Sequence, residues 1–154
     1  IGVCFAFVGM SAAITQTFLT GRLSERFGEG AMLAVGMALT MVCVACQPFS
    51  TGAVMTIALM CLTAIGQSVA FPNVGALISR TADPRKQGQI LGLNNAASAL
   101  SRVIGPFCSG LAFAGISING PFFMGALVVA PAILLALSAS RRANIQLREM
   151  RAEP

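Results

Sequence analysis

The clearest binding chemistry in this sequence comes from three polar residues with the spacing i, i+3 and i+7: Asn95, Ser98 and Arg102. In an α-helix that spacing places all three side chains on one face. A guanidinium beside an amide and a hydroxyl suits an anionic or zwitterionic ligand, or a carboxylate supplied by another segment. The alternatives are an arginine that extends outward to water and one that makes a purely structural pair.

Three amides, Gln16, Gln67 and Asn73, stand in otherwise apolar surroundings. Each either faces a ligand cavity or hydrogen-bonds to a neighbouring helix. Asn73 follows Pro72, and a proline removes one backbone hydrogen bond and favours a kink. Phe71-Pro72-Asn73 is therefore either a bend in a moving gate or a kink in a packing helix.

The residues that most enzymes need are scarce. The chain has no His, and Asp83 is its single Asp, so Ser–His pairs, paired aspartates and His-based zinc motifs are all missing. Cys43 and Cys46 have the spacing of a redox or zinc pair, but they lie in an apolar segment without a second pair, which favours plain packing. We predict that the chain is not an enzyme and uses no metal or cofactor.

The elements that position these residues follow from where charge is absent. Residues 30–79 contain no Asp, Glu, Lys or Arg, and residues 87–140 contain only Arg102. Hydrophobic residues make up 56% of the chain and charged residues 10%, whereas soluble domains carry about 25% charged residues. A membrane crossing takes ~20 apolar helical residues, so each stretch is long enough to cross twice. The sequence predicts an all-α membrane protein, a polytopic bundle of about five helices.

The crossings are expected at about residues 1–20, 31–46, 53–79, 88–114 and 121–139, forming a bundle over 1–140 that a basic tail at 141–154 follows. The second and fifth crossings are apolar almost all round, which predicts lipid on most of their sides. Because the chain begins within an apolar run and without Met, we expect that part of a larger protein is missing.

Apart from Arg102, the basic residues fall in three groups, near Arg22, Arg80 and Arg141. Hairpins would bring all three groups to one side, and the positive-inside rule makes that side, and the C-terminus, cytoplasmic. The net charge of +5 is thereby explained by membrane orientation, and we expect no nucleic-acid partner.

The link between the first two crossings has the sequence GRLSERFG. Its glycines allow a tight reversal, and its alternating charges could latch two groups of helices together on one side of the membrane. The alternative is a solvated loop that only anchors orientation. The candidate latch comprises Gly21, Arg22, Glu25, Arg26 and Gly28.

The fourth crossing carries a stripe of small residues and a proline. Small stripes let helix backbones approach closely in lipid, and the proline invites a kink. Static close packing is the alternative to a functional role. The residues concerned are Gly92, Ser101, Gly105, Pro106 and Gly110.

These motifs resemble signatures of the major facilitator superfamily. The link at 21–28 is similar to that family's loop signature G-x-L-[AS]-[DE]-R-x-G, with Glu25 in place of the commoner Asp. The fourth crossing is similar to the antiporter signature G-x8-G-x3-G-P-x2-G-G, with Ser101 and Ser109 in place of glycines. Residues 78–92 resemble the link between helices ten and eleven of drug and tetracycline:proton antiporters.

The resemblance implies that the five crossings are helices eight to twelve of a twelve-helix transporter, of which eight, ten and eleven line the central cavity or its gates. It implies a multi-pass protein of the plasma membrane, as in a bacterial inner membrane. The implied partners are the lipid bilayer, the missing N-terminal half, a small-molecule substrate and protons.

The resemblance further implies export of drug-like or tetracycline-like compounds by alternating access with proton antiport. No Asp, Glu or His lies in any predicted crossing, so a proton-coupling residue would have to lie in the missing half. The alternatives are a transporter of the same fold for sugars, metabolites or organic anions, the last favoured by Arg102, and a non-transporting scaffold subunit.

Overall fold

The computed structural model describes residues 2–83 and 85–152. For residues 80, 81 and 139–152 it describes the backbone only. All regular structure in this part of the chain is helical. The elements are α1 (Gly2–Ile14), the π-helix η1 (Thr15–Thr20), α2 (Gly21–Phe27), α3 (Glu29–Cys46), the 3-10 helix η2 (Gln47–Phe49), α4 (Ala53–Thr81), α5 (Gln87–Gly115) and α6 (Gly120–Ala152).

Five helical segments are long and apolar enough to cross a membrane. They are Gly2–Phe27, Glu29–Phe49, Ala53–Ser79, Gln87–Gly115 and Gly120–Ser138. The predicted all-α bundle of about five helices is confirmed. The first segment is longer than expected because α1, η1 and α2 follow one another without a break, and α6 continues as helix through most of the predicted basic tail, up to Ala152.

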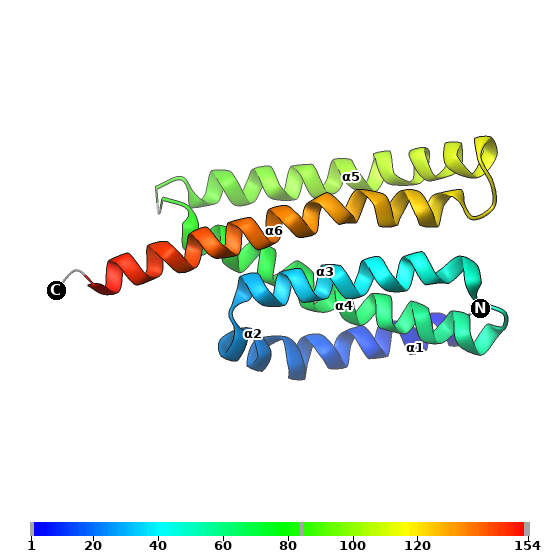
Figure 1. Cartoon of the computed structure of the whole chain (residues 1–154), viewed down its shortest axis with the longest axis horizontal. Helices are drawn as coiled ribbons and strands as arrows, with labels where there is room; N and C mark the ends of the chain where they lie inside the picture. The colour runs from blue at the N-terminus through cyan, green and yellow to red at the C-terminus, as the bar shows by residue number, and fades with distance from the viewer. Residues whose placement is uncertain (1, 84, 153–154) are drawn as a thin grey trace.

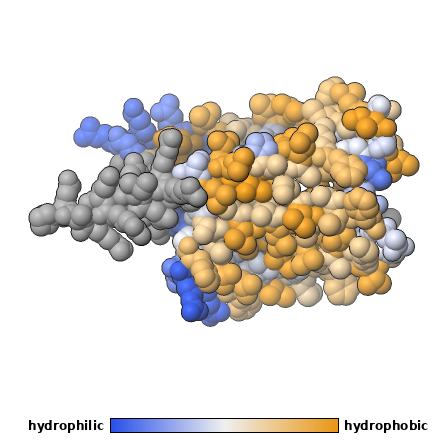
Figure 2. Space-filling view, viewed as in Figure 1, coloured by the Kyte–Doolittle hydropathy of each residue, from blue (hydrophilic) through white to orange (hydrophobic). Residues whose placement is uncertain are grey.

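The segments run alternately up and down, so the connections collect at two ends (Figure 1). Residues 27–29, 82–83 and 85–86 lie at one end, and the turns at 47–52 and 116–119 lie at the other. Figure 2 shows most of the strongly hydrophilic residues at the first end and a largely hydrophobic surface beyond it. The hairpin arrangement expected from the charge pattern is therefore present.

Helix α3 lies at the centre of the bundle, packed against α4 and α6. Its buried residues are Gly30, Met32, Leu33, Ala34, Gly36, Thr40 and Cys43. The prediction that this second crossing faces lipid on most sides is wrong. A helix that is apolar all round suits a protein interior as well as lipid, because both are apolar, and composition alone does not separate the two.

The contact between α3 and α4 is a close backbone crossing at Gly36 and Gly66. A Cβ placed on Gly36 would lie 2.6 Å from the Gly66 carbonyl oxygen, and one on Gly66 would lie 2.7 Å from the Gly36 carbonyl oxygen. Thr40 stands one turn beyond Gly36 and donates its hydroxyl to the Gly36 carbonyl at 2.9 Å. Small residues four apart on each helix, completed by Ala70, produce the approach that drives helix association in lipid.

Next to this crossing is a small core in which Leu33, Ala70 and Ala136 are buried against one another. Met37, Val74 and Leu77 pack around them. The core joins α3, α4 and α6, and α4 also packs along α1 and η1. Helix α4 thereby packs against α3 and α6 as well as against α1 and η1.

We expect Gly66→Ala to destabilise the bundle. The added methyl group would lie 2.6 Å from the Thr40 Oγ1 and 2.7 Å from backbone, so α3 and α4 must move apart. The free energy of unfolding should fall by about 1–3 kcal/mol, measured by unfolding the detergent-solubilised protein in a denaturing detergent. Gly75→Ala on the same helix is the matched control, because nothing lies within 4 Å of its added Cβ. Equal losses in the two variants would contradict the close crossing.

Candidate functional site

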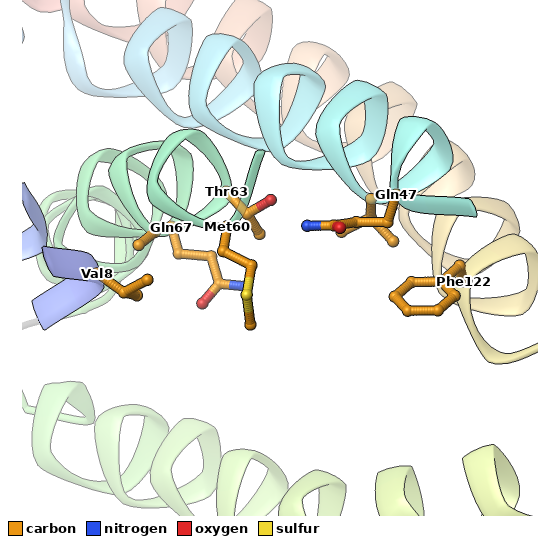
Figure 3. Close-up of a pocket in the computed structure, with 8 residues that line it drawn as sticks. Val8, Gln47, Met60, Thr63, Gln67 and Phe122 are labelled. Atoms are coloured by element: carbon orange, nitrogen blue, oxygen red, sulfur yellow. The ribbon is translucent and has the colours of Figure 1, made fainter. Parts of the chain in front are cut away.

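Gln67 of α4 lines three adjoining cavities. The largest, of about 290 Å³, lies between α4 and segments of α1, α3, η2 and α6. Figure 3 shows Gln67 and Gln47 reaching toward this space from different elements, with Met60, Thr63 and Phe122 around it. The Gln67 side chain is exposed in the described chain, and it is a polar group common to all three cavities.

The second cavity, of about 200 Å³, lies between η1 and α4 and brings Gln16 to the same space as Gln67. Its lining residues are Ala12, Gln16, Ala64, Gln67, Ser68, Phe71 and Pro72. The third, also about 200 Å³, lies between α3, α4 and α6 and includes Thr40 and Val129. Two of the predicted site residues, Gln16 and Gln67, are thus brought together by the fold.

The chemistry of these linings is neutral. Among the described residues, no Asp, Glu, Lys or Arg lines any of the three cavities. Carboxamides both donate and accept hydrogen bonds, while the surrounding Val, Met, Phe and Ala side chains offer apolar contact. An apolar cavity with a few polar groups is the usual form of a small-molecule site.

The segment that carries Gln16 is a π-helix rather than an α-helix. Short π-helices are rare and occur frequently at functional sites. Thr15 and Thr20, at the two ends of η1, are buried. The Thr20 hydroxyl lies 3.1 Å from the Thr15 carbonyl oxygen and 3.3 Å from the Ser68 carbonyl oxygen on α4, so it connects η1 to the neighbouring helix.

Asn73 lies inside α4 and lines none of the three cavities. It is 2% exposed, and its Nδ2 donates to the Val69 carbonyl of its own helix at 2.6 Å. The structure therefore places this predicted gate residue within the packed helix, while Phe71 and Pro72 beside it line a cavity. This arrangement favours the interpretation of Asn73 as part of a kinked packing helix.

The polar face of α5 lies apart from these cavities. Asn95, Ser98 and Arg102 stand on one face of a continuous helix, and all three are exposed and line none of the three cavities. The predicted site residues thus fall into the amides Gln16 and Gln67 at the cavities, the α5 face, and Asn73, which is buried within α4. A cavity role for Arg102 stays a prediction.

The small-residue motif of α5 makes no close helix contact in the described structure. A Cβ on Gly92, Gly105 or Gly110 would meet nothing within 4 Å. Ser101 is exposed and donates to the Ala97 carbonyl of its own helix at 2.9 Å, and Pro106 lies within the same helix. The close approach that the motif predicts occurs instead between α3 and α4.

The latch candidates form the short helix α2 and its end. Gly28 has φ 86° and ψ 146°, a conformation that is essentially restricted to glycine. Arg22 donates to the Phe18 carbonyl at 3.4 Å, and the Arg26 guanidinium lies 5.9 Å from the centre of the Phe27 ring. Gly21 is helical, and Glu25 is exposed. These side chains lie at the charged end of the bundle.

Sequence reasoning missed several residues that the structure places at the site. Gln47, Met60 and Phe122 line the largest cavity, and Thr20 connects η1 to α4. Only the small-residue spacing at the α3–α4 crossing carried a signal that sequence reading could have used. No group of three His, Cys, Asp or Glu side chains that could hold a metal ion occurs among the described residues.

A bundle of apolar spanning helices with carboxamide-lined cavities defines a polytopic α-helical membrane protein. Residues 1–153 match the Major Facilitator Superfamily, and the chain belongs to that family. This membership points to a transporter rather than an enzyme.

The chain resembles the class C tetracycline resistance protein of Escherichia coli, with 34% identity over 106 residues, which is 69% of this chain and 26% of the relative. The class G protein of Vibrio anguillarum is also 34% identical over 106 residues, covering 69% and 27%. Probable anion transporter 3, chloroplastic, of Arabidopsis thaliana is 29% identical over 114 residues, covering 72% and 22%. The chain spans about a quarter of the length of these relatives, and no solved structure matches it.

We expect Gly28→Ala to weaken the link between the first two spanning segments. A side chain at φ 86° is strained by about 1–3 kcal/mol. The fraction of folded protein extracted from membranes should fall, as measured by fluorescence-detected size-exclusion chromatography. Gly21→Ala is the control, because Gly21 is helical with open space around a Cβ. A normal yield of Gly28→Ala would show that the link tolerates a different backbone path.

Proposed function

We propose that this chain is the C-terminal part, helices eight to twelve, of a secondary active transporter that exports drug-like or tetracycline-like compounds by alternating access with proton antiport. The observation that carries the proposal is Gln67 at the shared wall of three uncharged cavities within the membrane span. The two tetracycline resistance relatives support the same substrate class.

The cavity chemistry fits an uncharged amphiphile. Apolar linings supply most of the binding free energy, and the Gln16 and Gln67 carboxamides orient carbonyl, hydroxyl or amide groups of a ligand. A scaffold subunit has no need of carboxamides directed into cavities inside a membrane, where an unpaired polar group is costly.

The rest of the proposed machinery belongs to the remainder of the transporter. The only acidic residues in the five spanning segments are Glu25 and Glu29, which lie at the charged end beside the link at Gly28, and the segments contain no His. The group that carries the proton within the membrane therefore lies on the N-terminal half, which is the proposed protein partner. The two halves alternate between open states, and the charged link around α2 latches the basic side.

An organic-anion transporter is the second candidate. It is favoured by Arg102, an exposed guanidinium on a spanning helix with Asn95 and Ser98 on the same face. A guanidinium on a spanning helix would attract a carboxylate or phosphate substrate. The anion-transporter relative from Arabidopsis thaliana supports this reading at lower identity.

The two candidates predict opposite effects of two variants in the complete transporter. On the leading proposal, Gln67→Leu raises the KM for tetracycline export about tenfold, the equivalent of one lost hydrogen bond, while Arg102→Met leaves it near the original value. Energised everted vesicles, followed by tetracycline fluorescence, provide the measurement. Gln89→Leu makes the same chemical change at an exposed position outside the three cavities and serves as the control.

The same vesicles loaded with carboxyfluorescein test the alternative. Transport of this anion that is lost in Arg102→Met and kept in Gln67→Leu, without tetracycline export, would replace the leading proposal with the anion transporter. Absence of both activities at normal membrane levels would overturn both.

We further propose that the charged end of the bundle faces the cytoplasm of a bacterial cell, so that the C-terminus is cytoplasmic. In a variant lacking the five native cysteines, Thr51→Cys should react with an impermeant maleimide in intact cells, and Lys86→Cys only after permeabilisation. These residues lie at opposite ends of the bundle. Labelling of both from one side would contradict the hairpins, and an inverted pattern would reverse the orientation.

A further inference from the structure

Pro72 leaves one carbonyl of α4 without its usual partner. In an α-helix the N–H of residue i donates to the carbonyl of residue i−4, and proline has no N–H. The carbonyl concerned is that of Ser68, one turn before Pro72 in the spanning segment Ala53–Ser79. Water is scarce at that depth, so the carbonyl needs another donor.

The donor comes from the π-helix of the first spanning segment. The Thr20 Oγ1 lies 3.3 Å from the Ser68 carbonyl oxygen, and the Thr20 side chain is 6% exposed. The same Oγ1 lies 3.1 Å from the carbonyl oxygen of Thr15, five residues earlier in η1. Because a hydroxyl has one hydrogen to donate, the Thr15 and Ser68 carbonyls share it.

The two elements that this hydrogen bond joins, η1 and α4, line the same cavity. Gln16, in the first turn of η1, lines the cavity between η1 and α4 together with Gln67, Ser68 and Pro72. The η1–α4 spacing determines how far apart the two carboxamides stand. Thr20 lies at the other end of η1 from Gln16, so it ties the far end of the segment to α4.

We infer that Thr20 is a positioning residue for the Gln16–Gln67 site. Its hydroxyl satisfies the carbonyl that Pro72 exposes, and this bond holds η1 against the interrupted stretch of α4. A hydroxyl of the π-helix thereby pairs with the carbonyl that the proline leaves free. This contact sets the separation between the Gln16 and Gln67 carboxamides. The geometric part of this inference rests only on the contact between η1 and α4. The expected effect on transport rests on the proposed function.

The test is a double-mutant cycle in the complete transporter with Thr20→Val and Pro72→Ala. Thr20→Val removes the hydroxyl at nearly constant volume and should raise the KM for tetracycline about fivefold, with the maximal rate and the membrane level little changed. Thr20→Ser, which keeps the hydroxyl, should restore the KM. In Pro72→Ala the new N–H satisfies the Ser68 carbonyl, so adding Thr20→Val should change the KM no further.

Thr15→Val is the matched control. Thr15 lies in the same π-helix, is 5% exposed, and donates its hydroxyl at 2.8 Å to the Ser11 carbonyl of α1, within its own spanning segment and not on α4. It should leave the KM unchanged. Equal effects of Thr15→Val and Thr20→Val, or strictly additive effects of Thr20→Val and Pro72→Ala, would overturn the inference.

A second readout needs no substrate. Hydrogen–deuterium exchange of the purified transporter should show faster exchange of the residue 15–20 amides in Thr20→Val and no change in Thr15→Val. If exchange follows this pattern and tetracycline is not transported, the transport proposal fails while the η1–α4 contact stands. If tetracycline is transported and exchange is unchanged in Thr20→Val, the positioning role fails while the transport proposal stands.

Discussion

The constraint on which this structure depends is that a chain inside lipid must satisfy its backbone hydrogen bonds with its own groups. It explains why the described elements are helical, since a helix pairs most of its backbone groups within one segment. It also makes the break at a proline inside a helix, such as Pro72, expensive unless another donor lies nearby. At Pro72 the donor is the Thr20 hydroxyl of η1, in the neighbouring first spanning segment. The hydrogen bond that α4 lacks is thereby replaced by a contact between two helices beside a cavity.

Close packing accounts for the rest of the bundle. Gly36 and Gly66 bring α3 and α4 within backbone contact, and α6 completes a small core around Leu33. Helix α5 is held much more loosely, and its glycines face open space in the described structure. Lipid provides no hydrophobic force between helices, so contact area and small residues decide which helices pack tightly.

Much of the fold could be predicted, because missing charge is a signal spread over long stretches such as residues 30–79. The position of α3 could not, since an apolar surface fits lipid and protein alike. Gln16 and Gln67 could be chosen by residue type. Their shared cavity could not, because it depends on how η1 lies against α4. Nothing in Thr15–Thr20 distinguishes a π-helix from an α-helix, so the role of Thr20 becomes visible only in three dimensions.

The distribution of charge limits what the amide site can bind. A charged ligand brought beside Gln67 would lose its hydration without meeting an opposite charge, because the described cavity linings carry none. A neutral ligand avoids that cost and needs only hydrogen-bond partners, which the carboxamides provide. Charge recognition and proton transfer therefore require groups outside these cavities: Arg102 on α5 in the case of an anion, or ionisable residues on a partner segment in the case of a proton. This separation of uncharged cavities from charged groups is the physical basis for assigning the two proposed tasks, substrate binding and proton coupling, to different parts of the proposed transporter.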